Sequence, residues 1–263
     1  MHDLAFVFAG FLVGLIVGLT GVGGGSLMTP ILIFAFGVKP YLAVGTDLLF
    51  AAGTKFGGAA ALARSRSIDW PVVRLLTIGS IPAALATVYV LHNAGPADPA
   101  VQQVMTTTLG AALLLTAAAT LYKAIRGKAS PREIPPEQLA QATRPRHWSL
   151  PVLFGAAIGA LVSLTSVGAG AIGVTVLMLL YPALPLPRIV AADIAYAVPL
   201  TLVAGLGHAS LGSVNWPLLG TLLIGSLPGI WLGSRLGRRA PERLIRSLLS
   251  VLLAYAGVRL ISI

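Results

Sequence analysis

Two acidic residues that could carry protons, Asp47 and Asp193, stand within apolar stretches of the chain. A carboxylate near the midpoint of a membrane helix costs about 2.5–3.5 kcal/mol on insertion scales, so it usually has a role. A shift of 146 positions relates one to the other, and we expect the carboxylates to approach each other across a two-fold axis. Neighbouring buried carboxylates compete for protons, which suits proton coupling. A structural hydrogen bond to freed backbone N–H groups is a compatible alternative.

Two further side chains could take part in moving charge. Lys55 follows Asp47 by about two helical turns and could attract an anion, although its long side chain could equally reach the interface near Arg64. Its counterpart under the same shift is Thr201, so this charge is not duplicated. His208 titrates near neutral pH and is a third candidate for proton coupling, with a structural interfacial histidine as the alternative.

Glycine-rich segments at 21–26 and 166–170 each precede an apolar run that is too short to cross a bilayer comfortably. Paired helix breaks in matching halves point to a transport site, because exposed backbone inside a membrane must line a polar cavity or be buried in protein. The helix N-termini that follow favour an anion, and close helix packing is the alternative reason for the glycines. The predicted anion-binding residues are Thr20, Gly21, Gly23, Gly24, Gly25, Ser26, Lys55, Thr165, Ser166, Gly168 and Gly170.

The composition is that of a membrane protein, because 56% of the 263 residues are hydrophobic, 10% are charged and the mean hydropathy is +0.89. Too few polar residues remain to cover a soluble globular surface. Continuous apolar runs argue against a β-barrel, and the absence of cysteine excludes thiolate chemistry and disulfides. Basic cytoplasmic loops explain the net charge of +10 better than nucleic acid does. The first apolar run lacks a basic flank and is predicted to be a retained helix.

The apolar runs divide the chain into two similar halves. We predict a first transmembrane repeat at 1–125, a cytoplasmic linker at 126–147 and a second transmembrane repeat at 148–263, each repeat with about four to five helical segments. The shift of 146 also relates Trp70-Pro71 to Trp216-Pro217, Gly79-Ser80 to Gly225-Ser226 and Pro82 to Pro228. Such correspondence indicates internal duplication. The fold expected is an all-α polytopic membrane protein with broken or short helices near mid-membrane.

Charge asymmetry predicts that the two repeats face opposite ways. Arg64 and Arg66 place the loop before Trp70 in the cytoplasm, whereas its uncharged counterpart at 210–215 belongs outside. Similarly, the loop after His92 has no Lys or Arg, and its counterpart around residues 238–239 is basic. These assignments give an inverted-topology repeat, which is typical of secondary transporters. They leave open whether the short segments re-enter the membrane or continue the preceding helices.

Three groups of residues carry a family resemblance. They are 21–25 with Pro30, 44–48 with Thr54 and Lys55, and 191–195 with His208, Gly212, Asn215 and Trp216. Together they resemble the sulfite exporter TauE/SafE family over nearly the whole chain except the linker. The resemblance implies a multi-pass transporter in a bacterial inner membrane that exports sulfur-containing anions such as sulfite, thiosulfate or organosulfonates, driven by protons. The second break departs from the first in having Ser166 and Ala169 where the first has glycine.

We therefore expect a proton-linked secondary transporter, and not an enzyme, with a small anion, protons and membrane lipid as its partners. No cofactor, metal or nucleic acid is expected, and a homo-oligomer is left open. An intramembrane aspartyl protease is one alternative, since two membrane aspartates could share a proton. A passive anion channel is another, and its currents would not saturate with substrate.

Overall fold

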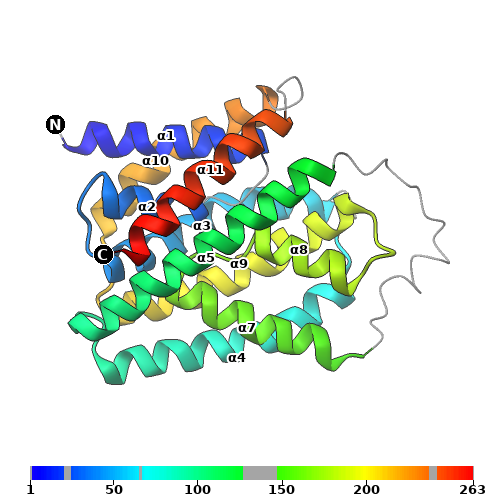
Figure 1. Ribbon diagram of the computed structural model, residues 1–263, viewed down its shortest axis with the longest axis horizontal. Helices are drawn as coiled ribbons and strands as arrows, with labels where there is room; N and C mark the ends of the chain where they lie inside the picture. Colours follow the sequence, from blue (N-terminus) through cyan, green and yellow to red (C-terminus); the bar gives the residue numbers. More distant parts are fainter. Residues whose placement is uncertain (1, 21–24, 65–66, 127–146, 237–241, 263) are drawn as a thin grey trace.

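The computed structural model describes residues 2–20, 25–64, 67–126, 147–236 and 242–262, where every regular element is an α-helix (Figure 1). The ten helices of that part of the chain are α1 (His2–Thr20), α2 (Gly25–Phe34), α3 (Pro40–Arg64), α4 (Trp70–Ala94), α5 (Pro99–Arg126), α7 (Ser149–Thr165), α8 (Ala171–Leu180), α9 (Leu186–Ser210), α10 (Trp216–Leu236) and α11 (Glu242–Ile261). Five of these described helices, namely α4, α5, α9, α10 and α11, are long and apolar enough to cross a membrane. The prediction of an all-α polytopic membrane protein is confirmed.

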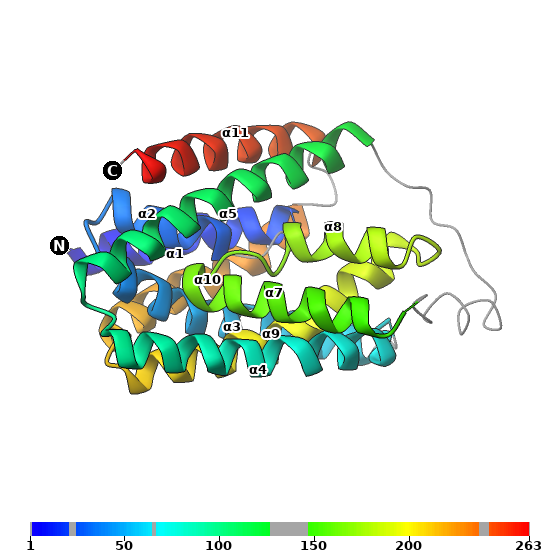
Figure 2. The ribbon, with the colours of Figure 1, turned by 60° about the horizontal axis from the view of Figure 1, so that its bottom comes forward.

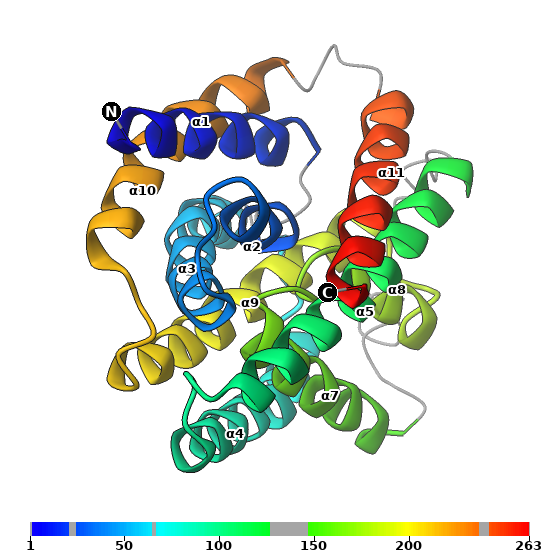
Figure 3. The same cartoon turned by 60° about the vertical axis from the view of Figure 1, so that its left-hand side comes forward.

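The helix that carries two of the candidate residues lies inside the bundle. α3 has 25 residues, the same length as α4 and α9, but its sequence includes Asp47 and Lys55. It packs against α9. Figure 3 shows that α3, α9 and α2 form the centre of the bundle, with α1 and α10 on one side of them and α4 and α7 on the other. Burial among helices keeps these charges away from lipid, where they would be costly.

The two short helices, α2 and α8, have ten residues each. Ten residues rise about 15 Å, which is half of the roughly 30 Å hydrocarbon thickness. α8 runs back toward the end of the bundle where α7 begins, and α2 runs back toward the end where α1 begins (Figures 1 and 2). The short segments therefore re-enter, which the run lengths and charge pattern left open.

Glycines let two helix pairs, α1 with α10 and α4 with α7, pack with their backbones in contact. A Cβ atom added at Gly14 would come within 3.0 Å of the Ser226 carbonyl oxygen, closer than real Cβ atoms approach. One added at Gly159 would meet Ser80 in the same way. Only a residue without a side chain fits such an approach, as in other closely packed membrane helices.

The contacts along these two seams correspond to one another. Three contacts between a glycine and a backbone carbonyl across the α1–α10 seam have counterparts across the α4–α7 seam. Residues of α1 correspond to residues 145 positions later in α7, and residues of α10 correspond to residues 146 positions earlier in α4. The matching pairs are Gly10–Leu222 with Gly155–Leu76, Gly14–Ser226 with Gly159–Ser80, and Gly225–Val7 with Gly79–Val152. The similarity between the halves therefore extends from sequence to individual packing contacts.

The central helices α3 and α9 run in opposite directions. Gly45, near the start of α3, lies against His208, near the end of α9, and Gly205 lies against Leu49. The segment at 67–69 before α4 and the corresponding segment at 211–215 before α10 lie at opposite ends of the bundle (Figure 1). The second of these segments lies at the same end as both termini.

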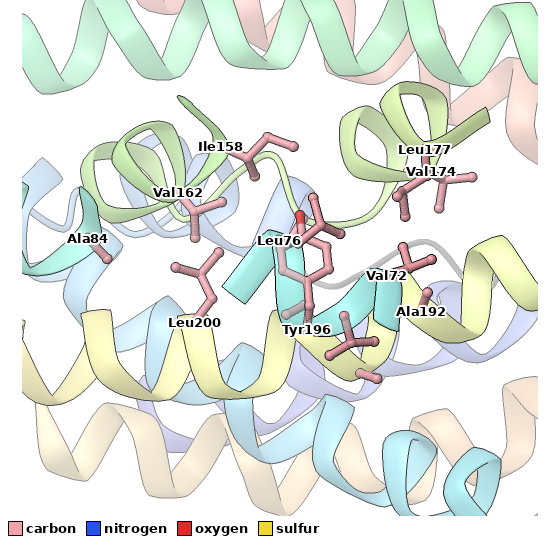
Figure 4. Packing of buried hydrophobic residues seen from close by; sticks show 14 of the residues in the cluster. Val72, Leu76, Ala84, Ile158, Val162, Val174, Leu177, Ala192, Tyr196 and Leu200 are labelled. Atoms are coloured by element: carbon pink, nitrogen blue, oxygen red, sulfur yellow. The ribbon is translucent and has the colours of Figure 1, made fainter. Parts of the chain in front are cut away.

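The re-entrant helix α8 is held by an apolar core as well as by its connections. Figure 4 shows Leu177 of α8 near Val72 and Leu76 of α4, with Tyr196 of α9 beside them. Leu76 and Tyr196 are fully buried. Burying a large apolar side chain stabilises a protein by about 1.5–3 kcal/mol, so this packing fixes where the chain between α7 and α8 can lie.

Candidate functional site

The second break is present where the sequence predicts it, between α7 and α8. Ser166 adopts the left-handed conformation with φ 59°, and Gly168 and Gly170 also have positive φ, at 134° and 130°. The Ser166 N–H donates to the Val162 carbonyl at 2.7 Å, which closes the last turn of α7. Left-handed backbone suits glycine and is unusual for serine, so a serine at this position suggests a use for its hydroxyl group.

The two hydroxyl groups of this break have different environments. Thr165 donates to the Leu161 carbonyl at 2.6 Å and accepts from the Val167 N–H at 3.1 Å, so it supports the local backbone. The Ser166 hydroxyl is buried and makes no hydrogen bond within the described part of the chain. It lies beside the Asp47 carboxyl group, and the two therefore form one polar centre.

Asp47 is fully buried between the two halves of the chain. The Thr29 hydroxyl of α2 donates to its Oδ2 atom, and Ser166 approaches from the second break. Its Oδ1 atom has no hydrogen-bond partner among the described residues. A carboxylate oxygen without a partner is costly in a dry interior, so this group is poised to take a proton or another donor.

Lys55 reaches the same break from two turns further along α3. Its side chain is buried, at 9% exposed, and its Nζ atom donates to the Ala169 carbonyl at 3.2 Å. The ammonium group does not reach the interface near Arg64, so the alternative of snorkelling is wrong. An ammonium has three N–H donors, and this hydrogen bond uses one of them. The charges of Asp47 and Asp193 both act on it.

Asp193 is buried between α9 and the first turn of α8. It is 2% exposed, and a Cβ atom added at Gly173 would collide with its carboxylate and with the Tyr196 hydroxyl. Gly173 therefore admits the carboxylate to the surface of α8. Neither Gly173 nor Tyr196 was predicted as part of the site, because a single glycine or tyrosine in an apolar run carries no distinct sequence signal.

The expectation that the two carboxylates approach each other is wrong. Since α3 and α9 are antiparallel and touch at Leu49 and Gly205, Asp47 lies about 3 Å to one side of that contact and Asp193 about 18 Å to the other. Their backbones are thus about 20 Å apart. Two aspartates at this distance cannot share a proton, so the structure offers no support for an aspartyl protease.

The third candidate for proton coupling, His208, is distant from Asp193. It lies fifteen residues after Asp193 on α9, about 22 Å along the helix. Its Nε2 atom is 2.8 Å from the Ser163 carbonyl oxygen, an arrangement in which that nitrogen carries the proton. Its Nδ1 atom is buried without a hydrogen-bond partner in the described residues. The structure places His208 against Gly45, two residues before Asp47 on α3, so it is distant from Asp193 but lies at the level of Asp47.

The predicted first break lies largely outside the described residues. This applies to Gly21, Gly23 and Gly24 and to the side chain of Thr20. Gly25 and Ser26 begin α2, and Ser26 is buried. The linker is likewise outside the described residues from 127 to 146.

One ion pair joins the two halves away from the centre. The Arg188 guanidinium at the start of α9 donates to Asp69, immediately before α4, at 2.9 Å. Burial raises the pKa of Asp69, and the charge of Arg188 opposes that rise. The repeat counterparts are Leu42 and Asn215, so the other end of the bundle has no such pair. Sequence reasoning missed this contact because 119 positions separate its members.

Comparisons with known proteins agree with this architecture. The model of the family called sulfite exporter TauE/SafE matches residues 6–260. The chain is 34% identical over 268 residues to a Bacillus subtilis (strain 168) protein named probable membrane transporter protein YjnA, covering 98% of this chain and 100% of the relative. It is 26% identical to the probable membrane transporter protein YunE of the same organism, covering 99% and 98% of the two chains. No solved structure matches significantly. This multi-pass membrane protein therefore belongs to the sulfite exporter TauE/SafE family of membrane transporters.

Proposed function

We propose that the protein is a secondary transporter that exports a small sulfur-containing oxyanion, bound at the second break beside Lys55. The observation that carries the proposal is the buried Lys55 ammonium, which donates to Ala169 and retains two donors for an oxyanion. The first turn of α8 adds the positive end of a helix dipole, which a bound anion would share with the Asp193 carboxylate beside Gly173. Sulfite, thiosulfate and organosulfonates all present oxygen atoms that suit such donors, and the family name favours this class.

Proton linkage follows from the charges around that site. Lys55 contributes one positive charge against the carboxylates of Asp47 and Asp193, which both act on it. A bound anion would be repelled by these carboxylates, and protonation of either one would weaken the repulsion. Asp47 also adjoins Ser166, three residues from the carbonyl that accepts from Lys55. Proton and anion occupancy would therefore depend on each other.

Alternating access would use the two halves as an inverted repeat. Three features support this arrangement: the matching glycine seams, the antiparallel α3 and α9, and the placement of corresponding loops at opposite ends. We infer that the linker is cytoplasmic and that the membrane is a bacterial inner membrane. Arg64, Arg188 and Arg235 lie near helix ends on the linker's side, as the positive-inside rule requires. In that orientation an inside-negative potential favours anion export by about 2.3 kcal/mol per charge per 100 mV.

The test is flux of radiolabelled sulfite from proteoliposomes, with pH gradients of either sign. The wild-type protein should saturate with sulfite and respond to the gradient. Lys55→Gln should lose at least tenfold in flux, whereas Thr201→Val, at the repeat counterpart, should change flux by less than twofold. Sulfite flux through Lys55→Gln equal to that of the wild type would overturn the proposal, and non-saturating currents would favour a channel.

A further inference from the structure

An apolar groove of about 750 Å³ opens on the surface where α3, α4 and α9 meet. Its lining is apolar apart from Arg74 and Thr77, and the Thr77 hydroxyl is engaged by the Val73 carbonyl of its own helix at 2.7 Å. Phe56 and Ile78 on its walls are 65% and 60% exposed. In a membrane protein such exposed apolar walls face lipid, so the chemistry of the groove is set by its one charged residue.

Arg74 is an exposed arginine within the apolar span of α4. It lies one turn after Trp70, which is exposed and lines the same groove. Tryptophan at a helix start is typical of the membrane interface. Among the described residues Arg74 has no ion-pair partner, and a guanidinium at this depth must extend toward the headgroups to find an anion.

The dimensions of the groove fit an acyl chain. From Trp70 to Ile78 the helix rises about 12 Å, which is most of the roughly 15 Å thickness of one hydrocarbon leaflet. Val198 and Pro199 of α9 line its third wall. A chain lying along it would place its headgroup phosphate near Trp70, within reach of the extended Arg74 side chain, whose planar fork of donors matches phosphate oxygens.

We propose that this groove is a binding site for an anionic phospholipid, with one acyl chain between α3, α4 and α9 and the headgroup phosphate on Arg74. The comparison between the halves supports an anionic headgroup. At the repeat counterpart of Arg74 stands Gly220, although Trp216 corresponds to Trp70. Elsewhere on the surface, a different groove of about 630 Å³ between α1 and α10 has an entirely apolar lining with no charged residue. Charge selectivity is therefore expected at the Arg74 groove alone.

The test uses the full-length protein purified in a zwitterionic detergent with phosphatidylcholine, to which phosphatidylglycerol is added. Native mass spectrometry counts the lipids retained. The wild-type protein should keep one phosphatidylglycerol with at least fivefold preference over phosphatidylcholine. Arg74→Gln should abolish the preference, and Ala59→Phe, which fills the groove while leaving the arginine, should lower retention of that lipid. Arg259→Gln, a matched change at an exposed arginine on α11, should have no effect.

Two further arms keep the result unambiguous. Glycerol 3-phosphate, which has the phosphate without acyl chains, should fail to displace the lipid, and displacement would assign the site to free phosphates instead. Thermal unfolding of each variant in the same detergent verifies that it is folded, and a variant that fails is replaced by Arg74→Lys, for which reduced retention is expected. Equal retention of both lipids by the wild type, or an unchanged preference in Arg74→Gln, would overturn the proposal.

Discussion

The two central helices have the same frame but different chemistry. On α3, Asp47 is followed after eight positions by Lys55, which crosses to the second break. On α9, Asp193 is followed at the same interval by Thr201, whose hydroxyl donates to the Ala197 carbonyl of its own helix at 2.8 Å. Duplication thus supplied two carboxylates, but a lysine at only one of the two matching positions. A duplicated scaffold can therefore carry the proposed anion site in one half only.

The glycine seams offer the most severe test of the symmetric part of this comparison. Leucine at Gly14 or at Gly159 would meet backbone atoms that cannot move aside. Overpacking of this kind costs about 1–3 kcal/mol or more, and backbone contact places it at the upper end. Both variants should lose folded protein or fall by a similar, large margin in thermal unfolding temperature.

Gly220→Leu is the control for these variants, because no atom lies within 4 Å of a Cβ added there. It should unfold at nearly the wild-type temperature. If Gly14→Leu unfolded at a much lower temperature and Gly159→Leu did not, the two seams would not be equivalent, and the structural symmetry of the two halves would be contradicted.

The two carboxylates should differ in their effect on transport. Asp47→Asn should abolish the dependence of sulfite flux on pH, because Asp47 adjoins Ser166 at the break that Lys55 reaches. Asp193→Asn should alter that dependence without abolishing it, because its carboxylate acts on the Lys55 ammonium from beside Gly173 in the first turn of α8. The measurement is the initial rate of flux between about pH 5.5 and 8 in proteoliposomes. A double variant with wild-type pH dependence would remove both carboxylates from the coupling.

Ser166 allows the backbone and the hydroxyl group to be tested separately. Left-handed backbone costs a non-glycine residue about 1–2 kcal/mol, so Ser166→Gly should unfold at a higher temperature than Ser166→Ala. Both variants lose the hydroxyl beside Asp47, and both should lose a few-fold in sulfite flux. Wild-type flux in Ser166→Gly would reduce this residue to a helix terminator.

The smallest effect is expected at the ion pair that only one end of the bundle has. Because the pKa of Asp69 is raised in the folded protein, its contribution to stability is greatest when it is protonated and falls as the pH rises through that pKa. The unfolding temperature of the wild type minus that of Asp69→Asn should therefore be larger near pH 4 than near pH 7. A difference independent of pH would contradict this assignment. Leu42→Ala, at the counterpart of Arg188, controls for general pH effects.

The sequence was sufficient for those parts of the fold that depend on local patterns. Apolar run lengths predict short segments at about 27–36 and 171–181, and the structure has α2 at Gly25–Phe34 and α8 at Ala171–Leu180. The glycine-rich motif predicts the second break, and its positive φ angles agree. These features follow from helix length and backbone freedom, which a single segment determines.

Contacts between distant segments could not be predicted in the same way. A shift of 146 positions relates Asp47 to Asp193, but it does not say where along α3 and α9 the helices meet. They meet at Leu49 and Gly205, which separates the carboxylates. Similarly, nothing in the short segment around Thr29 marks it as the donor to Asp47, because that role depends on how α2 packs after re-entering.

We propose that the anion binds at one break, which is the break that Lys55 reaches. The most direct measurement is a structure of the protein with bound selenite, a sulfite analogue whose selenium can be located by anomalous scattering. A selenium peak is expected within about 4 Å of the Lys55 Nζ atom, beside Ala169. A selenium peak elsewhere in the protein, with none beside Lys55, would contradict this proposal.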